Sequence, residues 1–208
     1  MQKYSSKMIN IAVLASGNGT NLQSIIDKIE SGFLTAKISF VLSDRKDAFA
    51  LERAKNHNIK AIFLDPKKYK SREDYDSQII KCLEKNGANL VILAGFMRLL
   101  SSSFVAKYKY RIINIHPSLL PSFPGIHGYE DAWEYAVKIS GCTVHFVDEG
   151  LDTGPIILQK LNPVNDNDTF ESFKERGLQI EHEALPEAIK LFCEDRLKVD
   201  GRKVKIIN

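Results

Sequence analysis

The sequence has 208 residues, 44% of them hydrophobic, and its 29 lysines and arginines exceed its 26 aspartates and glutamates by three. This length predicts one domain that buries a core of its own, and so small a positive excess argues against nucleic acid or a membrane surface as a partner. The three cysteines form no CxxC pair, which argues against a zinc site and a disulfide framework. We expect a cytoplasmic monomer or homodimer, with a flexible extension over residues 1–7 and a single domain over residues 8–208.

The first half of the chain alternates short apolar runs, rich in β-branched residues, with longer amphipathic stretches. Runs of this kind fit strands that are buried on both faces and connected by helices, so the pattern predicts a Rossmann-like, doubly wound α/β fold. Its sheet is expected to be mostly parallel, with helices on both faces. The expected strands are Asn10–Ala15, Lys37–Leu42, Lys60–Leu64, Asn89–Ala94 and Arg111–Ile115, and the expected helices are Thr20–Ser31, Ala48–Asn56, Arg72–Asn86 and Ser101–Lys107.

The pattern changes after His116, where three prolines and a glycine within nine residues exclude a regular helix or a central strand. Beyond that loop, helical and strand periodicities return. A terminal hairpin is expected around Asp200-Gly201, because Asp-Gly suits a two-residue turn. The remaining expected elements are a helix over Tyr129–Val137, strands over Cys142–Val147 and Pro155–Leu161, a long helix over Thr169–Glu194, and hairpin strands over Arg196–Val199 and Lys203–Ile207.

A loop of small residues, Ser16-Gly-Asn-Gly-Thr-Asn21, follows the first strand, and a helix is expected to begin near Thr20. Backbone N–H groups and the positive end of a helix together suit a phosphate. The loop meets neither the dinucleotide GxGxxG pattern nor the P-loop pattern. A plain tight turn capped by Thr20 or Asn21 explains it equally well. Asp44, after the second strand, stands where a dinucleotide enzyme would hold a ribose, so a non-catalytic nucleotide-binding module remains an alternative.

Two polar residues end the fifth expected strand. Asn114 and His116 are two apart, so they share a face at the carboxyl edge of the sheet, where α/β folds bind ligands. An amide donor and an imidazole suit a carbonyl whose oxygen becomes negative during attack by an amine. The alternative is a structural pair that holds the following loop in place.

An acidic loop lies between the strands expected at residues 142–147 and 155–161. It carries Asp148, Glu149 and Asp152 between glycines, and its spacing does not match an EF-hand. One of the carboxylates is expected to pair with His116, raise its pKa and organise proton transfer. The residues themselves do not show which of the three does so, and a solvated turn remains open for Asp148 and Glu149.

Four segments together resemble the glycinamide ribonucleotide formyltransferase family, and the resemblance runs from about Met8 to Leu197. They are the stretches 15–22 (ASGNGTNL), 93–98 (LAGFMR), 114–121 (NIHPSLLP) and 145–155, which begins HFV and ends DTGP. The third is shared with methionyl-tRNA formyltransferase and formyltetrahydrofolate hydrolase. Members of those two families should carry an additional domain, for which 208 residues leave no room.

The resemblance implies a function and a set of residue roles. The expected reaction transfers the formyl group of 10-formyltetrahydrofolate to the amine of glycinamide ribonucleotide, a step of purine synthesis that needs no metal. Asn114, His116 and Asp152 would be the catalytic trio, with Asp152 paired to His116. The residues expected to hold the ribonucleotide are Gly19, Thr20 and Asn21 at its phosphate and Glu181 at its ribose or glycinamide end.

The folate site implied by the resemblance surrounds the pterin with apolar side chains. Arg98 is expected to meet the glutamate carboxylate of the folate. The residues expected to line this site are Met97, Arg98, Leu99, Leu100, Val147, Glu149 and Leu151.

The sequence departs from the family at one position of the proline loop. Tyr129 stands where some members carry a second histidine, which puts the control of this loop in doubt more than the chemistry. Two alternatives to the transferase remain: a hydrolase that releases formate without the ribonucleotide, and the nucleotide-binding module.

Overall fold

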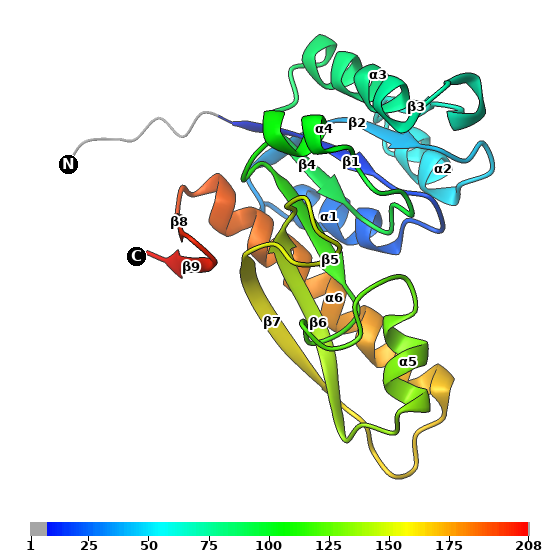
Figure 1. Ribbon diagram of the computed structural model, residues 1–208, viewed down its shortest axis with the longest axis vertical. Coiled ribbons are helices and arrows are strands. Elements are labelled where there is room, and N and C mark those ends of the chain that lie inside the picture. The colour runs from blue at the N-terminus through cyan, green and yellow to red at the C-terminus, as the bar shows by residue number, and fades with distance from the viewer. Residues whose placement is uncertain (1–7, 208) are drawn as a thin grey trace.

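The computed structural model describes residues 8–207, so the extension expected at residues 1–7 lies outside the described residues. The described chain forms one nine-stranded sheet with helices on both faces (Figure 1). The strands are β1 (Ile9–Leu14), β2 (Ala36–Ser43), β3 (Ala61–Phe63), β4 (Leu90–Leu93), β5 (Ile112–His116), β6 (Ile139–Phe146), β7 (Ile156–Pro163), β8 (Leu197–Asp200) and β9 (Lys203–Ile206). The helices are α1 (Thr20–Glu30), α2 (Phe49–Asn56), the short 3-10 helix η1 (Pro66–Lys68), α3 (Arg72–Lys85), α4 (Ser102–Lys107), α5 (Gly128–Glu134) and α6 (Phe170–Cys193).

The strand order is β3-β2-β1-β4-β5-β6-β7-β9-β8. The five strands from β3 to β5 are all parallel, as the alternation of strands and helices predicts. The direction changes at β6, which pairs antiparallel with both β5 and β7. The carboxyl ends of β1, β4 and β5 therefore meet at one edge of the sheet, and the loops that follow them can form a common site.

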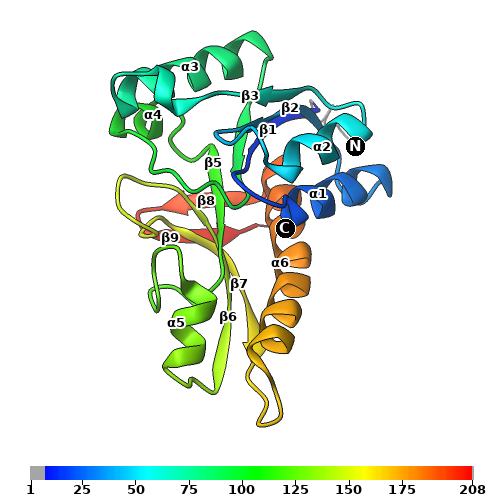
Figure 2. The ribbon, with the colours of Figure 1, turned by 90° about the vertical axis from the view of Figure 1, so that its right-hand side faces the viewer.

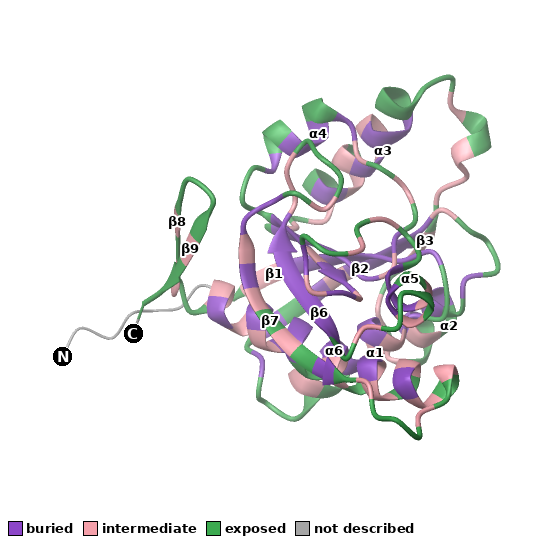
Figure 3. Ribbon diagram, turned by 60° about the horizontal axis from the view of Figure 1, so that its bottom comes forward, coloured by how far each residue is buried: buried purple, intermediate pink, exposed green. Residues whose placement is uncertain are grey.

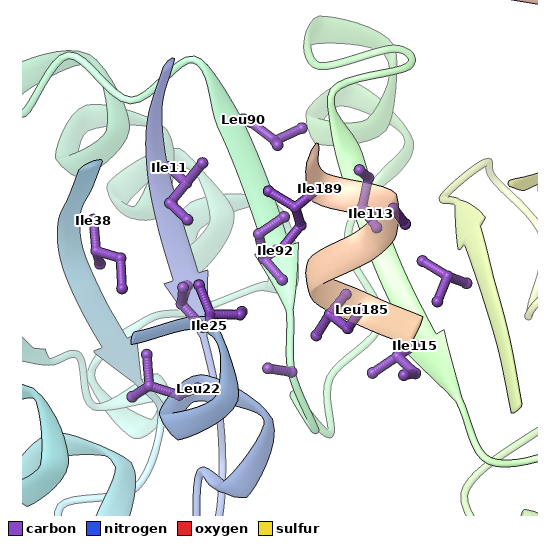
Figure 4. Close-up of a cluster of buried hydrophobic side chains, with 14 of the residues drawn as sticks. Ile11, Leu22, Ile25, Ile38, Leu90, Ile92, Ile113, Ile115, Leu185 and Ile189 are labelled. Carbon is purple, nitrogen blue, oxygen red and sulfur yellow. The ribbon is translucent and has the colours of Figure 1, made fainter. Parts of the chain in front are cut away.

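Alternate residues of the central strands are buried on opposite faces of the sheet. In β1, Ile11 and Val13 join one apolar cluster, whereas Ala12 and Leu14 join the other. Figure 4 shows the first cluster, in which isoleucines of four parallel strands meet side chains of α1 and α6. This double burial explains why the strands have almost continuously apolar sequences.

The second cluster covers the opposite face of the sheet and includes buried side chains of α3 and α4, among them Tyr75, Ile79 and Phe104. Figure 2 shows α6, the longest helix, lying along β6 and β7. Its first turn is fixed by a capping box, in which Thr169 and Ser172 exchange side-chain and backbone hydrogen bonds. Helix α6 also carries Glu181, which is buried.

Element boundaries differ from the sequence expectations by a few residues. Strand β6 begins at Ile139 rather than at Cys142, and α5 ends at Glu134 rather than at Val137, with Ala136 in a left-handed conformation. The predicted terminal hairpin of β8 and β9 is present, but its two loop residues are Gly201 and Arg202 rather than Asp200 and Gly201, because Asp200 still pairs with Lys203. Figure 3 shows that this hairpin stands apart from the buried strands at the centre. Within residues 8–207, no helix has the length and hydrophobicity needed to span a membrane.

Candidate active site

A cavity of about 700 Å³ opens at the carboxyl ends of β1, β4 and β5. Its walls come from the loops after these strands, from the acidic loop between β6 and β7, and from one face of α6. This volume suits a small organic ligand. All fourteen residues that the sequence marked as catalytic or binding line the cavity.

His116 and Asp152 meet inside this cavity. Nδ1 of His116 lies 3.5 Å from Oδ2 of Asp152, and only 3% of the histidine side chain is exposed. The other ring nitrogen, Nε2, lies 2.7 Å from the carbonyl oxygen of Phe123. Since a carbonyl only accepts hydrogen bonds, Nε2 is the donor in this contact. The Nε2–H group of His116 is thus held by a backbone carbonyl, while Nδ1 faces the carboxylate of Asp152.

Asn114 contacts a second histidine, His145, across the pairing of β5 with β6. The two residues are register partners, and Nδ2 of Asn114 lies 3.2 Å from Nε2 of His145. Nδ1 of His145 donates to the carbonyl oxygen of Phe146 at 2.8 Å, which leaves Nε2 as the acceptor for Asn114. His145 also approaches Asp152, with 3.7 Å between Nε2 and Oδ1. The carboxylate of Asp152 therefore lies between two histidines.

The sequence reasoning gave His145 no role. A signal was present, because His145 interrupts the apolar run of an otherwise buried strand. What the sequence did not show is that β6 pairs with β5 in the register that places His145 opposite Asn114.

Burial sets the protonation of this cluster. It lowers the pKa of His116, and the nearby Asp152 carboxylate and the Phe123 carbonyl oppose that shift only in part. Asp152 does act to raise the pKa of this histidine, as expected, but burial lowers it by more. Burial also acts to raise the pKa of Asp152, but the His145 side chain, the Gly125 N–H and the charge of His116 together lower it. The favoured state is a carboxylate beside a neutral imidazole.

The structure distinguishes two of the three carboxylates of the acidic loop. Asp152 faces the histidines, and its Oδ2 also accepts the N–H of Gly125 in the proline loop at 2.9 Å. Asp148 turns back into its own loop, where Oδ1 accepts from the N–H of Gly150 and from the hydroxyl of Thr153. Asp148 is therefore a turn residue.

The glycine loop presents the amino end of α1 to the cavity. Gly19 is the N-cap residue with a φ of 68°, and no side chain caps the helix, so the proposed caps Thr20 and Asn21 are not used in that way. A β-carbon at Gly19 would lie 2.8 Å from Cα of Ala50, so the position requires glycine for two reasons. The first N–H groups of α1 remain available for an anion.

Glu181 is buried and lines the cavity, so it is not an acid of the helix surface. Its Oε2 accepts from Nδ2 of Asn21 at 2.7 Å, and its Oε1 accepts from the hydroxyl of Tyr129. The side chain of Asn21 is thus turned toward Glu181. Asn21 can therefore contribute its backbone N–H group, and not its side chain, to a phosphate site.

Another part of the cavity lining is apolar and exposed. Met97 and Leu99 are each 59% exposed, and Leu151 is 50% exposed. Val147 and Leu100 pack on the apolar cluster below, and the guanidinium of Arg98 lies 5.0 Å from the centre of the Tyr75 ring. Exposed apolar side chains gathered at a cavity mouth indicate a ligand with a flat apolar part.

Asp44, the residue that favoured a dinucleotide-binding module, is engaged elsewhere. Its Oδ1 accepts from the hydroxyl of Ser16 at 2.6 Å, and the same hydroxyl accepts the N–H of Met97. Asp44 is not among the residues that line the cavity. Within residues 8–207, no three His, Cys, Asp or Glu side chains are grouped to hold a metal ion.

Residues 9–189 match the family described as formyl transferase. The chain belongs to this family. It is 40% identical to phosphoribosylglycinamide formyltransferase of Bacillus subtilis over 88% of this chain and 94% of the relative, and 42% identical to the Escherichia coli enzyme of that name over 92% and 90%. The crystal structure of glycinamide ribonucleotide transformylase 1 from Symbiobacterium toebii is 46% identical, with a TM-score of 0.95 over 100% of this chain and 99% of that one.

Two further matches differ more from this chain, one in length and one in sequence identity. The human trifunctional purine biosynthetic protein adenosine-3 is 43% identical over 98% of this chain, but the match covers only 20% of that protein. A formyltetrahydrofolate deformylase from Pseudomonas syringae is 28% identical, with a TM-score of 0.89 over 97% of this chain and 67% of that one. The family resemblance and the α/β fold predicted from the sequence are confirmed.

Proposed function

We propose that this enzyme transfers the formyl group of 10-formyltetrahydrofolate to the amine of glycinamide ribonucleotide. The products are formylglycinamide ribonucleotide and tetrahydrofolate, in the purine pathway that leads to IMP. The observation that carries the proposal is that Asn114, His116 and Asp152 line the same cavity as the free amino end of α1 and a group of exposed apolar side chains, with His116 beside Asp152. Relatives of nearly the same length bear the name of this activity.

The two substrates contact different parts of the cavity lining. The phosphate of the ribonucleotide takes the free N–H groups at the amino end of α1, beside Gly19, Thr20 and Asn21. The pterin takes the apolar mouth, and Arg98 meets a carboxylate of the folate tail. The glycinamide amine and the formyl carbon then meet beside His116.

The chemistry begins with attack of the amine nitrogen on the formyl carbon. The carbonyl oxygen becomes an oxyanion, which accepts from the N–H of Asn114 that does not donate to His145, and from Nε2–H of His116 once it leaves Phe123. Asp152 accepts the proton that the amine loses, directly or through water, and N10 of the folate takes up a proton as its bond to the formyl carbon breaks. The formyl carbon thus exchanges its bond to N10 of the folate for a bond to the glycinamide nitrogen.

Two physical effects supply most of the acceleration in this proposal. Holding both substrates in one cavity is worth up to about 7–11 kcal/mol in favourable cases. One well-placed oxyanion donor contributes about 3–4 kcal/mol. No step requires a metal ion, and activity that persists in the presence of a chelator is the expected result. The three free cysteines suit a cytoplasmic location.

The deciding experiment follows the formation of tetrahydrofolate from 10-formyltetrahydrofolate, with and without glycinamide ribonucleotide. The proposal expects formation that depends on the ribonucleotide. Equal formation without it would establish the hydrolase instead, for which the likeness to the deformylase is the supporting observation. No formation in either case would favour the nucleotide-binding module, although the position of Asp44 argues against it.

A further inference from the structure

Tyr129 stands at the start of a hydrogen-bonded chain that joins three helices. Its hydroxyl, on α5, donates to Oε1 of Glu181 on α6, and Oε2 of Glu181 accepts from the Asn21 amide on α1. Tyr129 is 5% exposed, Glu181 5% and Asn21 8%. Each of the three also lines the cavity.

The chain fixes the orientation of the Asn21 amide. A carboxylate only accepts hydrogen bonds, so the NH₂ group of Asn21 must face Glu181 and its Oδ1 must face away. That Oδ1 atom is buried and has no hydrogen-bond partner among residues 8–207. A donor group on a ligand would satisfy this acceptor and recover the cost of leaving it unpaired.

The ring of Tyr129 packs against Gly177, where the absence of a side chain leaves space for it. A β-carbon at Gly177 would lie 2.4 Å from Cε1 of Tyr129 and 2.6 Å from its hydroxyl oxygen. The ring also packs edge-on against Phe173, with 5.8 Å between the ring centres. The ring is therefore held in a place where its hydroxyl meets Glu181.

We propose that Tyr129 is the positioning residue of the ribonucleotide site: its hydroxyl holds the Glu181 carboxylate, and through it the Asn21 amide, in the arrangement that accepts hydrogen bonds from ribose hydroxyls. The proposal rests on the function proposed above. The lone pairs that remain on the two carboxylate oxygens of Glu181 are acceptors, and this residue lines the cavity together with the phosphate loop. Two acceptor atoms on one carboxylate suit the vicinal hydroxyls of a ribose.

The groups around Glu181 make the expected effect of the Tyr129 hydroxyl depend on pH. They are the hydroxyl of Tyr129 from α5, the amide of Asn21 from α1, the Cys142 thiol from β6 and the Lys174 ammonium from α6 itself. Burial raises the pKa of Glu181, and the hydrogen bond from Tyr129 opposes that rise. Removal of the hydroxyl therefore moves the pKa further up, and the carboxylate is lost at a higher pH.

The test is Tyr129→Phe, which removes the hydroxyl and keeps the ring. We expect KM for the ribonucleotide to rise about tenfold, the loss of about 1.4 kcal/mol of binding, while KM for 10-formyltetrahydrofolate changes less than about twofold. This rise becomes larger as the pH falls from about 8 to about 6. The matched control is Tyr135→Phe, because Tyr135 follows α5 directly and is 77% exposed. It should leave both KM values unchanged.

A double-mutant cycle separates action through Glu181 from a general packing effect. In a Glu181→Gln background, Tyr129→Phe is expected to change the KM for the ribonucleotide by less than about twofold, because the carboxylate is already absent. Calorimetric titration of each folded variant with the ribonucleotide alone provides the same comparison without turnover. An unchanged KM in Tyr129→Phe, or an equal rise in both backgrounds, would overturn the proposal. Failure of the parent enzyme to use the ribonucleotide at all would instead reject the proposed function.

Discussion

Asp152 makes its contacts from a left-handed backbone conformation, with a φ of 53°. Among side chains other than glycine, aspartate and asparagine adopt this conformation most readily. The same carboxylate approaches His116 and His145 and accepts the N–H of Gly125. One residue thus connects the acidic loop, the proline loop and both histidines.

Asp152→Asn is expected to lower kcat by about 10²- to 10⁴-fold, the usual contribution of a positioned acid or base. Asparagine keeps the backbone conformation and most of the hydrogen bonds, so the circular dichroism spectrum should stay unchanged. Steady-state kinetics measure the effect, and Asp166→Asn, at an exposed ion pair with Lys138, is the control. Near-normal turnover in Asp152→Asn and in His116→Ala together would reject the catalytic assignment.

At the scale of elements, the loop between β1 and α1 shows how closely the anion site depends on local backbone. Gly19 has a positive φ, and α2 approaches it so closely that Ala50 leaves no space for a side chain. A β-carbon added at Gly17, two residues earlier, would meet no atom within 4 Å, and the φ of Gly17 is not positive. Gly19 therefore has two physical reasons to be glycine, and neither of them applies to Gly17.

This difference predicts different costs for the same substitution. Gly19→Ala should lower the free energy of unfolding by about 1–3 kcal/mol, because it adds strain and a collision with α2. Gly17→Ala should change it by less than about 0.5 kcal/mol. Urea denaturation of both variants provides the comparison. Equal stabilities would show that α2 moves away at little cost.

At the scale of the whole molecule, two partly or fully buried histidines connect stability to pH. Burial holds the pKa of both His116 and His182 below that of an exposed imidazole. As the pH falls through about 6.5, the unfolded chain takes up protons that these folded imidazoles do not, so the free energy of unfolding decreases. Glu181 has the opposite effect on stability. Its pKa is raised, so the folded chain takes up this proton at a higher pH than the unfolded chain does, and the free energy of unfolding increases as the pH falls.

His182 allows this effect to be tested apart from catalysis, because it lines a second cavity of about 540 Å³ beside Arg53 and Asp27. Melting temperatures measured at about pH 7.5 and about pH 5.5 should fall less in His182→Gln than in the parent chain. The substitution removes one of the two groups whose protonation favours unfolding. An equal fall in both proteins would show that His182 takes no part.

The sequence predicted every strand and long helix of residues 8–207. Burial on both faces gives the central strands continuous apolar runs, whereas the partly exposed β8 and β9 were indicated by the Asp-Gly turn signal. The sequence placed the start of β6 three residues late, because Ser140 and Gly141 weaken the strand signal there. Local spacing singled out Asn114 and His116 at the end of a strand, whereas for the glycine loop it left a plain turn and a phosphate site equally open, and only the family resemblance favoured the phosphate. The contacts of Tyr129 with Glu181 and of Asn114 with His145 were not predictable, since they join positions 52 and 31 residues apart that only the folded sheet brings together.

The pairing of β5 with β6 also restricts how this chain can change in length. Asn114 lies opposite His145 and His116 opposite Thr143, with Ile113 and Ile115 on the apolar face between them. Side chains alternate along a strand, so an insertion or deletion of one codon within β5 would exchange the two faces. Asn114 and His116 would then point into the core. Length variation that preserves the site must therefore fall in the loops that flank the strand, where it leaves this alternation intact.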